Sequence, residues 1–117
     1  MSEAVITCTV RPINATTSII GILGELNLPA ESALMAAYEE ASTPTTRTIV
    51  LDLNGLDYMN SGGIGLLVTL MVRMKRESQR LLVFGLNEHY HQIFETARLN
   101  EVIGVYDTEA QALAAAG

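Results

Sequence analysis

Residues 47–65 read RTIVLDLNGLDYMNSGGIG, and this stretch decides the fold. Residues 48–53 form a nearly continuous apolar run, which is typical of a strand covered on both faces. A short loop then delivers Asn60, Ser61 and two glycines to the start of a strongly periodic helix. The pattern therefore predicts a serine hydroxyl and unpaired backbone N–H groups at the positive end of a helix dipole.

Strands and helices alternate on both sides of this stretch. Strands are expected at residues 5–10, 16–26, 48–53, 81–86 and 102–106, and helices after Pro29, over residues 61–77, from Asn87 and from Thr108. The first two strands are joined by a turn at residues 11–14 and should form an antiparallel pair at one edge. Short connections between alternating elements predict one α/β domain over residues 1–117. It should hold a mixed, mostly parallel sheet of about five strands with about four helices.

The helix over residues 61–77 has an apolar stripe that should face the core. Its expected members are Ile64, Leu67, Val68, Met71 and Val72. Two other methionines near this helix, Met59 and Met74, are expected to be partly exposed. Basic residues in the last turns suit the negative end of the helix dipole.

Composition narrows the functional classes. The chain has 117 residues, of which 49% are hydrophobic and 17% are charged, with a net charge of −6. The negative charge argues against nucleic acids and anionic membranes as partners, since both attract basic proteins. A single cysteine favours a reducing compartment. The start is not a signal peptide and no apolar run reaches the roughly 20 residues of a membrane span, so we expect a cytoplasmic protein.

Ser61 has two interpretations. As a helix N-cap it would stabilise the helix by about 1 kcal/mol. As a functional group it would be a modified or reactive hydroxyl, but a nucleophile needs a neighbouring base. The histidines, His89 and His91, lie at another helix start and their spacing makes a poor metal pair. The sequence therefore predicts no catalytic residue, no metal site, no cofactor and no enzyme.

The glycines beside Ser61 are also open to two interpretations. Gly62, Gly63 and Gly65 each reduce helix propensity, by about 1 kcal/mol at an interior position. They either allow close packing of the loop or leave a bare backbone surface for a protein or a phosphate. A nucleotide-binding phosphate loop is not supported, because the pattern GxxxxGK[ST] does not occur.

These motifs resemble the STAS domains, in particular the anti-sigma factor antagonists of the sporulation and stress-response type. The resemblance rests on residues 24–27 (GELN), 51–65, 81–86, 93–99 and 105–107, and it covers nearly the whole chain. Such proteins bind a serine kinase that acts as an anti-sigma factor. The kinase phosphorylates a serine at the start of the second helix, and a PP2C-type phosphatase reverses this. The resemblance implies that Ser61 is that serine.

The implied docking surface combines the loop after the second strand with the start of the second helix. Its expected residues are Asn27, Leu28, Pro29, Asn60, Ser61, Gly62, Gly63 and Ile64. A phosphate on Ser61 should receive hydrogen bonds from the N–H groups of Gly62, Gly63 and Ile64, so that the fold survives while a partner is repelled. Two positions depart from the family: Asn60 and Asn27 stand where relatives have aspartate, which removes two charges that the kinase or phosphatase could recognise.

Two other functions stay open on the sequence. One is a STAS scaffold subunit of a stress-signalling or lipid-transport complex. The other is a STAS module that binds a small ligand or nucleotide and is not regulated by phosphorylation. The sequence names no particular kinase or sigma factor, and it leaves the oligomeric state open.

Overall fold

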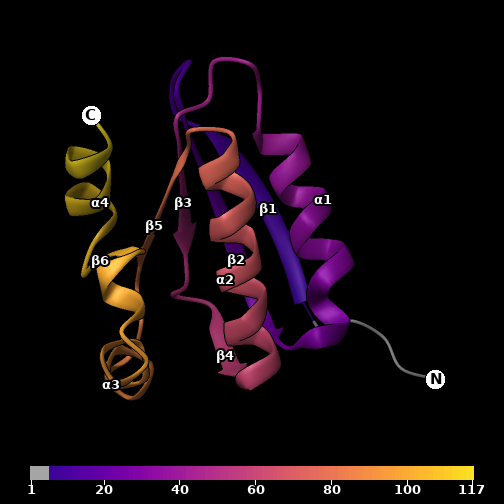
Figure 1. Ribbon diagram of the computed structural model, residues 1–117, viewed down its shortest axis with the longest axis vertical. Helices are drawn as coiled ribbons and strands as arrows, with labels where there is room; N and C mark the ends of the chain where they lie inside the picture. Colours follow the sequence, from indigo (N-terminus) through magenta and orange to yellow (C-terminus); the bar gives the residue numbers. More distant parts are fainter. Residues whose placement is uncertain (1–5) are drawn as a thin grey trace.

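The protein is described by a computed structural model that covers residues 6–117 (Figure 1). Along the chain the elements are β1 (Ile6–Pro12), β2 (Thr17–Leu26), the 3₁₀ turn η1 (Leu28–Ala30), α1 (Glu31–Ala41), β3 (Thr48–Asp52), β4 (Leu56–Met59), α2 (Ser61–Arg76), β5 (Arg80–Phe84), α3 (Glu88–Thr96), the 3₁₀ turn η2 (Leu99–Glu101), β6 (Gly104–Tyr106) and α4 (Glu109–Ala116). The strand expected from Val5 therefore begins outside the described residues.

One sheet of six strands organises the described chain, in the order β1-β2-β3-β5-β6 with β4 also paired to β2. Only the β1–β2 pair is antiparallel, and the other pairs are parallel. The α/β class, the mostly parallel sheet and the antiparallel pair at one edge are thus confirmed. The carboxyl ends of the parallel strands meet at one edge of the sheet, where α1, α2 and α3 begin.

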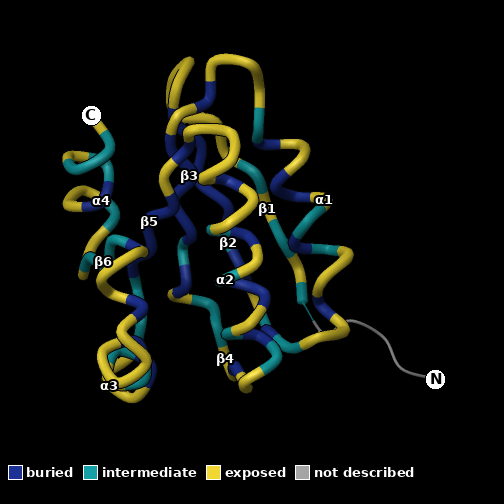
Figure 2. Tube along the Cα trace, in the orientation of Figure 1, coloured by how far each residue is buried: buried dark blue, intermediate teal, exposed yellow. Residues whose placement is uncertain are grey.

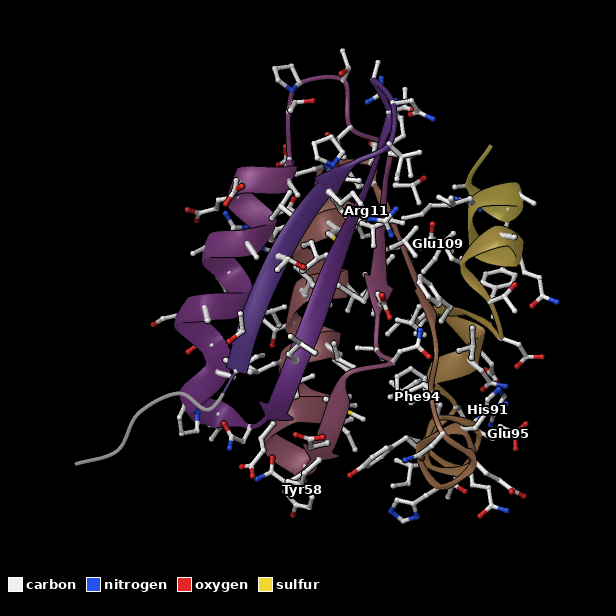
Figure 3. All side chains as sticks on the ribbon, turned by 180° about the vertical axis from the view of Figure 1, so that it is seen from behind. Arg11, Tyr58, His91, Phe94, Glu95 and Glu109 are labelled. Carbon is white, nitrogen blue, oxygen red and sulfur yellow. The ribbon has the colours of Figure 1, made fainter. Side chains whose placement is uncertain are left out.

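Helices form two layers around this sheet. On one face, α1, α2 and α3 cover the main core, which includes Leu34, Leu51, Leu67 and Phe94. On the other face, α4 covers a smaller cluster of Ile19, Val50, Leu82, Phe84 and Ala112. Buried segments accordingly run through the sheet while the outer helix faces are exposed (Figure 2). Seen from behind, β1 and the nearby part of β2 carry no helix over their outer face (Figure 3).

The strand β4 was not expected. The sequence predicts a loop between the third strand and the second helix, but Leu56–Met59 pairs with Gly24–Leu26 of β2. It continues along β2 after β3 has ended, since β3 pairs with β2 only as far as Gly21. A bulge between Gly24 and Glu25 shifts the register there. Only Asn60 separates the end of β4 from α2, so the pairing of β4 holds the start of that helix against β2.

The buried face of α2 is rotated from the predicted one. Its buried residues are Gly63, Leu66, Leu67, Leu70 and Met74, so of the predicted stripe only Leu67 is fully buried. Val72 is 42% exposed, and Ile64, Val68 and Met71 are half-buried. The prediction that Met59 and Met74 are partly exposed is also wrong, because both are buried. Helix and strand bounds otherwise differ from the predictions by a few residues, with Arg11 and Pro12 in β1 instead of in a turn.

Candidate functional site

The edge where the strands end brings two loops together. The chain leaves β2 at Leu26 and enters η1, and it leaves β4 at Met59 and enters α2. The Asn60 N–H donates to the Leu26 carbonyl over 3.4 Å. A Cβ added to Gly62 would lie 2.9 Å from Cγ of Leu28. The two loops predicted to form the docking surface are therefore neighbours.

Asn60 caps α2. Its side-chain Oδ1 accepts a hydrogen bond of 3.0 Å from the Gly63 N–H, and its carbonyl accepts from the Ile64 N–H over 3.0 Å. The interpretation of Ser61 as the N-cap is therefore wrong, since Ser61 is already the first helical residue. Ser61 is exposed, and its hydroxyl makes no hydrogen bond within residues 6–117. The hydroxyl is thus not needed to begin the helix.

The same cap changes the expected phosphate contacts. The N–H groups of Gly63 and Ile64 already donate to Asn60, so they are not free to donate to a phosphate as predicted. In the part of the chain that the structure describes, the N–H groups of Ser61 and Gly62 have no partner. These two groups point out of the first turn, as the first N–H groups of any α-helix do. They are the donors that an anion on Ser61 would meet.

The three glycines differ in what surrounds them. A Cβ on Gly63 would overlap with the Leu26 carbonyl, so this glycine lets α2 approach β2 closely. Gly63 is buried and confirms the close-packing interpretation at that position. Gly65 is exposed, and a Cβ there would meet no atom within 4 Å. Only Gly65 therefore leaves a bare backbone surface without an internal reason for glycine.

The first loop presents apolar side chains to solvent. Leu28 is 65% exposed and Pro29 is also exposed. Asn27 is half-buried, and its Oδ1 is buried without a hydrogen-bond partner among the described residues. An aspartate at this position would bury charge at the same place, which is more costly than burying an amide.

Two tyrosines at this edge were not singled out by the sequence. Tyr58 in β4 is 49% exposed and pairs with Glu25 of β2 on the face away from the main core. Tyr90 in α3 is buried, and its hydroxyl accepts a 2.9 Å hydrogen bond from the Met59 N–H. Recognising β4 as a strand would have placed Tyr58 on an exposed face. Tyr90 could have been singled out because a buried tyrosine hydroxyl usually needs a hydrogen-bond partner.

The electrostatic character of the edge is acidic. Glu25 and Asp57 lie near the ends of β2 and β4, and Glu31 and Glu88 lie in the first turns of α1 and α3. No lysine or arginine occurs at these strand ends or in these first turns. A partner that docks here meets negative charge around an apolar centre.

The remaining candidate groups lie elsewhere. His89 is exposed and its ring packs edge-on against Tyr90, with the ring centroids 4.9 Å apart. Residues 6–117 contain no group of three or more His, Cys, Asp or Glu side chains placed to hold a metal ion. Cys8 in β1 is half-buried, and this burial raises the pKa of its thiol. Within the same residues, no helix is long and apolar enough to cross a membrane.

The fold and this edge define a small α/β domain that presents a serine hydroxyl and apolar side chains where its central helix begins. The chain belongs to the STAS domain family, whose model matches residues 10–112. This confirms the resemblance seen in the sequence.

Several proteins of similar sequence have names that describe a regulatory role. The chain is 24% identical over 92 residues to an anti-sigma-B factor antagonist of Listeria monocytogenes, which covers 79% of this chain and 81% of the relative. It is 25% identical over 96 residues to an anti-sigma F factor antagonist of Paenibacillus polymyxa, with coverages of 81% and 82%.

Solved structures share the fold. An anti-sigma factor antagonist from Mycobacterium paratuberculosis has a TM-score of 0.79 and 21% identity, covering 94% of this chain and 92% of its own. The antagonist SpoIIAA in its unphosphorylated form has a TM-score of 0.69 and 20% identity, with coverages of 94% and 97%. A sulfate transporter family protein from Wolinella succinogenes has a TM-score of 0.77 and 17% identity, with coverages of 91% and 88%. Proteins with different names therefore share this fold, so the function of this chain has to be argued from its site and not from its fold.

Proposed function

We propose that this protein is an anti-sigma factor antagonist. It binds a serine kinase that acts as an anti-sigma factor, and phosphorylation of Ser61 ends this binding until a PP2C-type phosphatase removes the phosphate. In this scheme the chain is a cytoplasmic binding module and a substrate, and it does not itself catalyse a reaction. The names of its relatives support the general role.

The observation that carries the proposal is the state of Ser61. A kinase must reach a hydroxyl that is exposed and free, and Ser61 meets both conditions because Asn60 caps the helix in its place. A serine that capped α2 would have to give up its hydrogen bond before phosphorylation. Here the modification costs the fold no contact.

The docking surface, which we define as Asn27, Leu28, Pro29 and residues 60–64, explains how the phosphate would act. Exposed Leu28 lies against Gly62, directly beside the first turn of α2. A phosphate adds a charge of about −1.5 to −2 at pH 7. A partner packed over Leu28 would have to desolvate that charge, which is unfavourable unless it supplies a cation. Binding is therefore lost while the N–H groups of Ser61 and Gly62 accommodate the phosphate.

The test combines modification with binding. The protein is incubated with ATP and the anti-sigma-type serine kinase of its own host, and intact mass is measured before and after treatment with a PP2C-type phosphatase. We expect one phosphate per chain, removed by the phosphatase and absent in Ser61→Ala. Stoichiometric phosphorylation of Ser61→Ala would contradict the proposal.

Binding to the same kinase is then measured by calorimetry. Ser61→Asp should weaken binding at least tenfold, with a melting temperature within a few degrees of the native protein. The matched control is Ser78→Asp, which adds the same charge at an exposed position beyond the other end of α2. Its binding should be unchanged, and normal binding of Ser61→Asp would refute the switch.

A further inference from the structure

A second feature lies at the opposite end of α2 from Ser61. A cavity of about 370 Å³ opens between the last turns of α2, the start of β5, the turn η2 and the strand β6. Lys75, on this cavity, is fourteen residues beyond Ser61, which is about 21 Å along a helix. In Figure 1, α2 runs from its start beside β4 to this far end, where the chain turns into β5. The cavity is therefore separate from the docking surface.

The cavity has the size of a small-molecule site, and its lining is partly apolar and partly polar. Such sites usually have volumes of roughly 300–1,000 Å³ and combine apolar walls with a few polar groups. Met71 and the exposed Val102 provide apolar surface, and Asn100 and Tyr106 provide polar side chains. A ligand with an apolar body and at least one polar group fits this lining.

The charges around the cavity favour an anion. Of the seven basic residues, Arg11, Arg73 and Arg98 form salt bridges. The other four are Arg47, Lys75, Arg76 and Arg80, and none of them has an ion-pair partner within the described part of the chain. All four lie at this end: Lys75 and Arg76 end α2, and the Arg80 N–H donates to the Arg47 carbonyl over 2.8 Å.

Lys75 and Arg80 line the cavity itself. Arg80 Nη2 donates to the Ala115 carbonyl over 2.6 Å, which holds its guanidinium toward α4, on the other face of the sheet from Lys75. One carboxylate, Glu101, also lines the cavity, but it accepts a 2.8 Å hydrogen bond from Arg98 Nε. Among the described residues, the ammonium group of Lys75 therefore has no ion-pair partner at the cavity, in a chain whose net charge is −6.

We propose that this cavity binds a small organic anion, with its apolar body against Met71 and Val102 and its phosphate or carboxylate group at Lys75. Lys75 in the last turn of α2 also suits the helix dipole, and so does Arg76. The two residues differ in that only Lys75 lines the cavity. This difference provides a matched pair of variants.

The experiment is an NMR titration of the full chain, labelled with ¹⁵N, with phenyl phosphate as the anionic probe. We expect saturable shifts at the amides of residues 71–82 and 100–106, and no saturable shifts with benzyl alcohol, which lacks the charge. Lys75→Met should weaken binding at least fivefold, whereas Arg76→Met should change it less than twofold. Comparable shifts in the rest of each variant's spectrum show that both have folded.

Three results would overturn the proposal. Shifts that do not saturate, or that map to residues 60–65 instead, would show that the cavity takes up no small anion. Equal weakening by Lys75→Met and Arg76→Met would show that phenyl phosphate is attracted by the overall positive charge at this end of α2 and is not bound in the cavity. None of these results depends on whether Ser61 is phosphorylated, so the test is independent of the function proposed above.

Discussion

Asn60 and Ser61 are neighbours with separate tasks. Asn60 turns its side chain back to the Gly63 N–H and so begins α2, while the hydroxyl of Ser61 faces solvent. Compared with an aspartate at position 60, Asn60 lacks a charge but keeps the hydrogen bond, because the amide oxygen accepts as a carboxylate does. The loss of charge thus bears on recognition by a partner and leaves the geometry of the helix start intact.

This division predicts unequal effects of two alanine substitutions. Asn60→Ala should lower the free energy of unfolding by about 1 kcal/mol, because the cap is lost. Ser61→Ala should change it by less than about 0.5 kcal/mol, as for surface positions without special contacts. Urea unfolding of both variants measures the difference. A larger loss for Ser61→Ala than for Asn60→Ala would show that the serine is the cap after all.

The glycines of the same turn give a second pair. Gly63→Ala should destabilise the protein by about 2–3 kcal/mol or prevent folding, because its Cβ would overlap with the Leu26 carbonyl. Gly65→Ala should stabilise it by about 0.5–1 kcal/mol, since its Cβ meets open space on a helix. Thermal unfolding compares the two. A stabilised Gly65→Ala variant with weaker kinase binding would add Gly65 to the docking surface.

At the scale of elements, what the sequence predicts depends on how regular each element is. The strand β3 is found because its apolar residues are continuous and covered on both sides. The strand β4 is missed because Asp57 and Tyr58 are both exposed, so no alternation marks it. The bulge places an extra residue, Asp57, in β4 between the partners of Gly24 and Glu25, and a bulge leaves little trace in one sequence.

The predicted face of α2 fails for a related reason. Apolar residues surround much of this helix, and the sequence offers more than one possible stripe. The packing of Gly63 against Leu26 fixes the rotation of α2 and turns Met74 into the core and Val72 out of it. That contact joins a residue of α2 to the last residue of β2, and the local sequence pattern contains no signal of it. The position of Ser61 at the start of α2 was predictable, whereas the residue that caps this helix was not.

An ion pair links α4 to the edge strand. Arg11 donates to both carboxylate oxygens of Glu109, over 2.6 and 3.2 Å, and the two residues face each other in Figure 3. This hydrogen bonding holds the pKa of Glu109 below its ordinary value and raises the pKa of Arg11. Both side chains are well exposed, so solvent screening limits the gain in stability to at most about 1 kcal/mol.

The pH dependence of this pair has a definite sign. Because the pKa of Glu109 is lower in the folded state, its contribution is complete above the unfolded value of about 4.3 and is lost as the pH falls through the lowered folded value. NMR titration of the Glu109 carboxyl should give a midpoint below about 4.3. Arg11→Gln should move that midpoint back toward 4.3, and an unchanged midpoint would show that the pair does not form in solution.

Over the whole molecule, charge is divided between the two ends of the sheet. Carboxylates surround the start of α2, whereas the four basic residues without ion-pair partners in the described chain lie at its far end. Such a distribution orients a charged partner before contact. If the docking surface binds a kinase, the kinase must offer a basic surface to it.

This asymmetry predicts a dependence on salt. Raising the ionic strength from about 0.05 to about 0.5 M should slow association with the kinase at least tenfold, because electrostatic steering is screened. Asp57→Asn should reduce this dependence, while Glu77→Gln, at the end of α2 far from Ser61, should not. Stopped-flow measurements give the rates. Equal effects of the two variants would place the contact surface elsewhere.

Because the Ser61 hydroxyl makes no hydrogen bond within the described residues, its modification has a consequence for how long a cellular signal would last. Since the Ser61 side chain makes no hydrogen bond that the fold needs, the phosphorylated and unphosphorylated proteins should be equally stable. Degradation should then remove both forms at the same rate. The ratio of the two forms would then change only when an enzyme acts. A phosphate on Ser61 would thus persist for as long as the phosphatase is inactive.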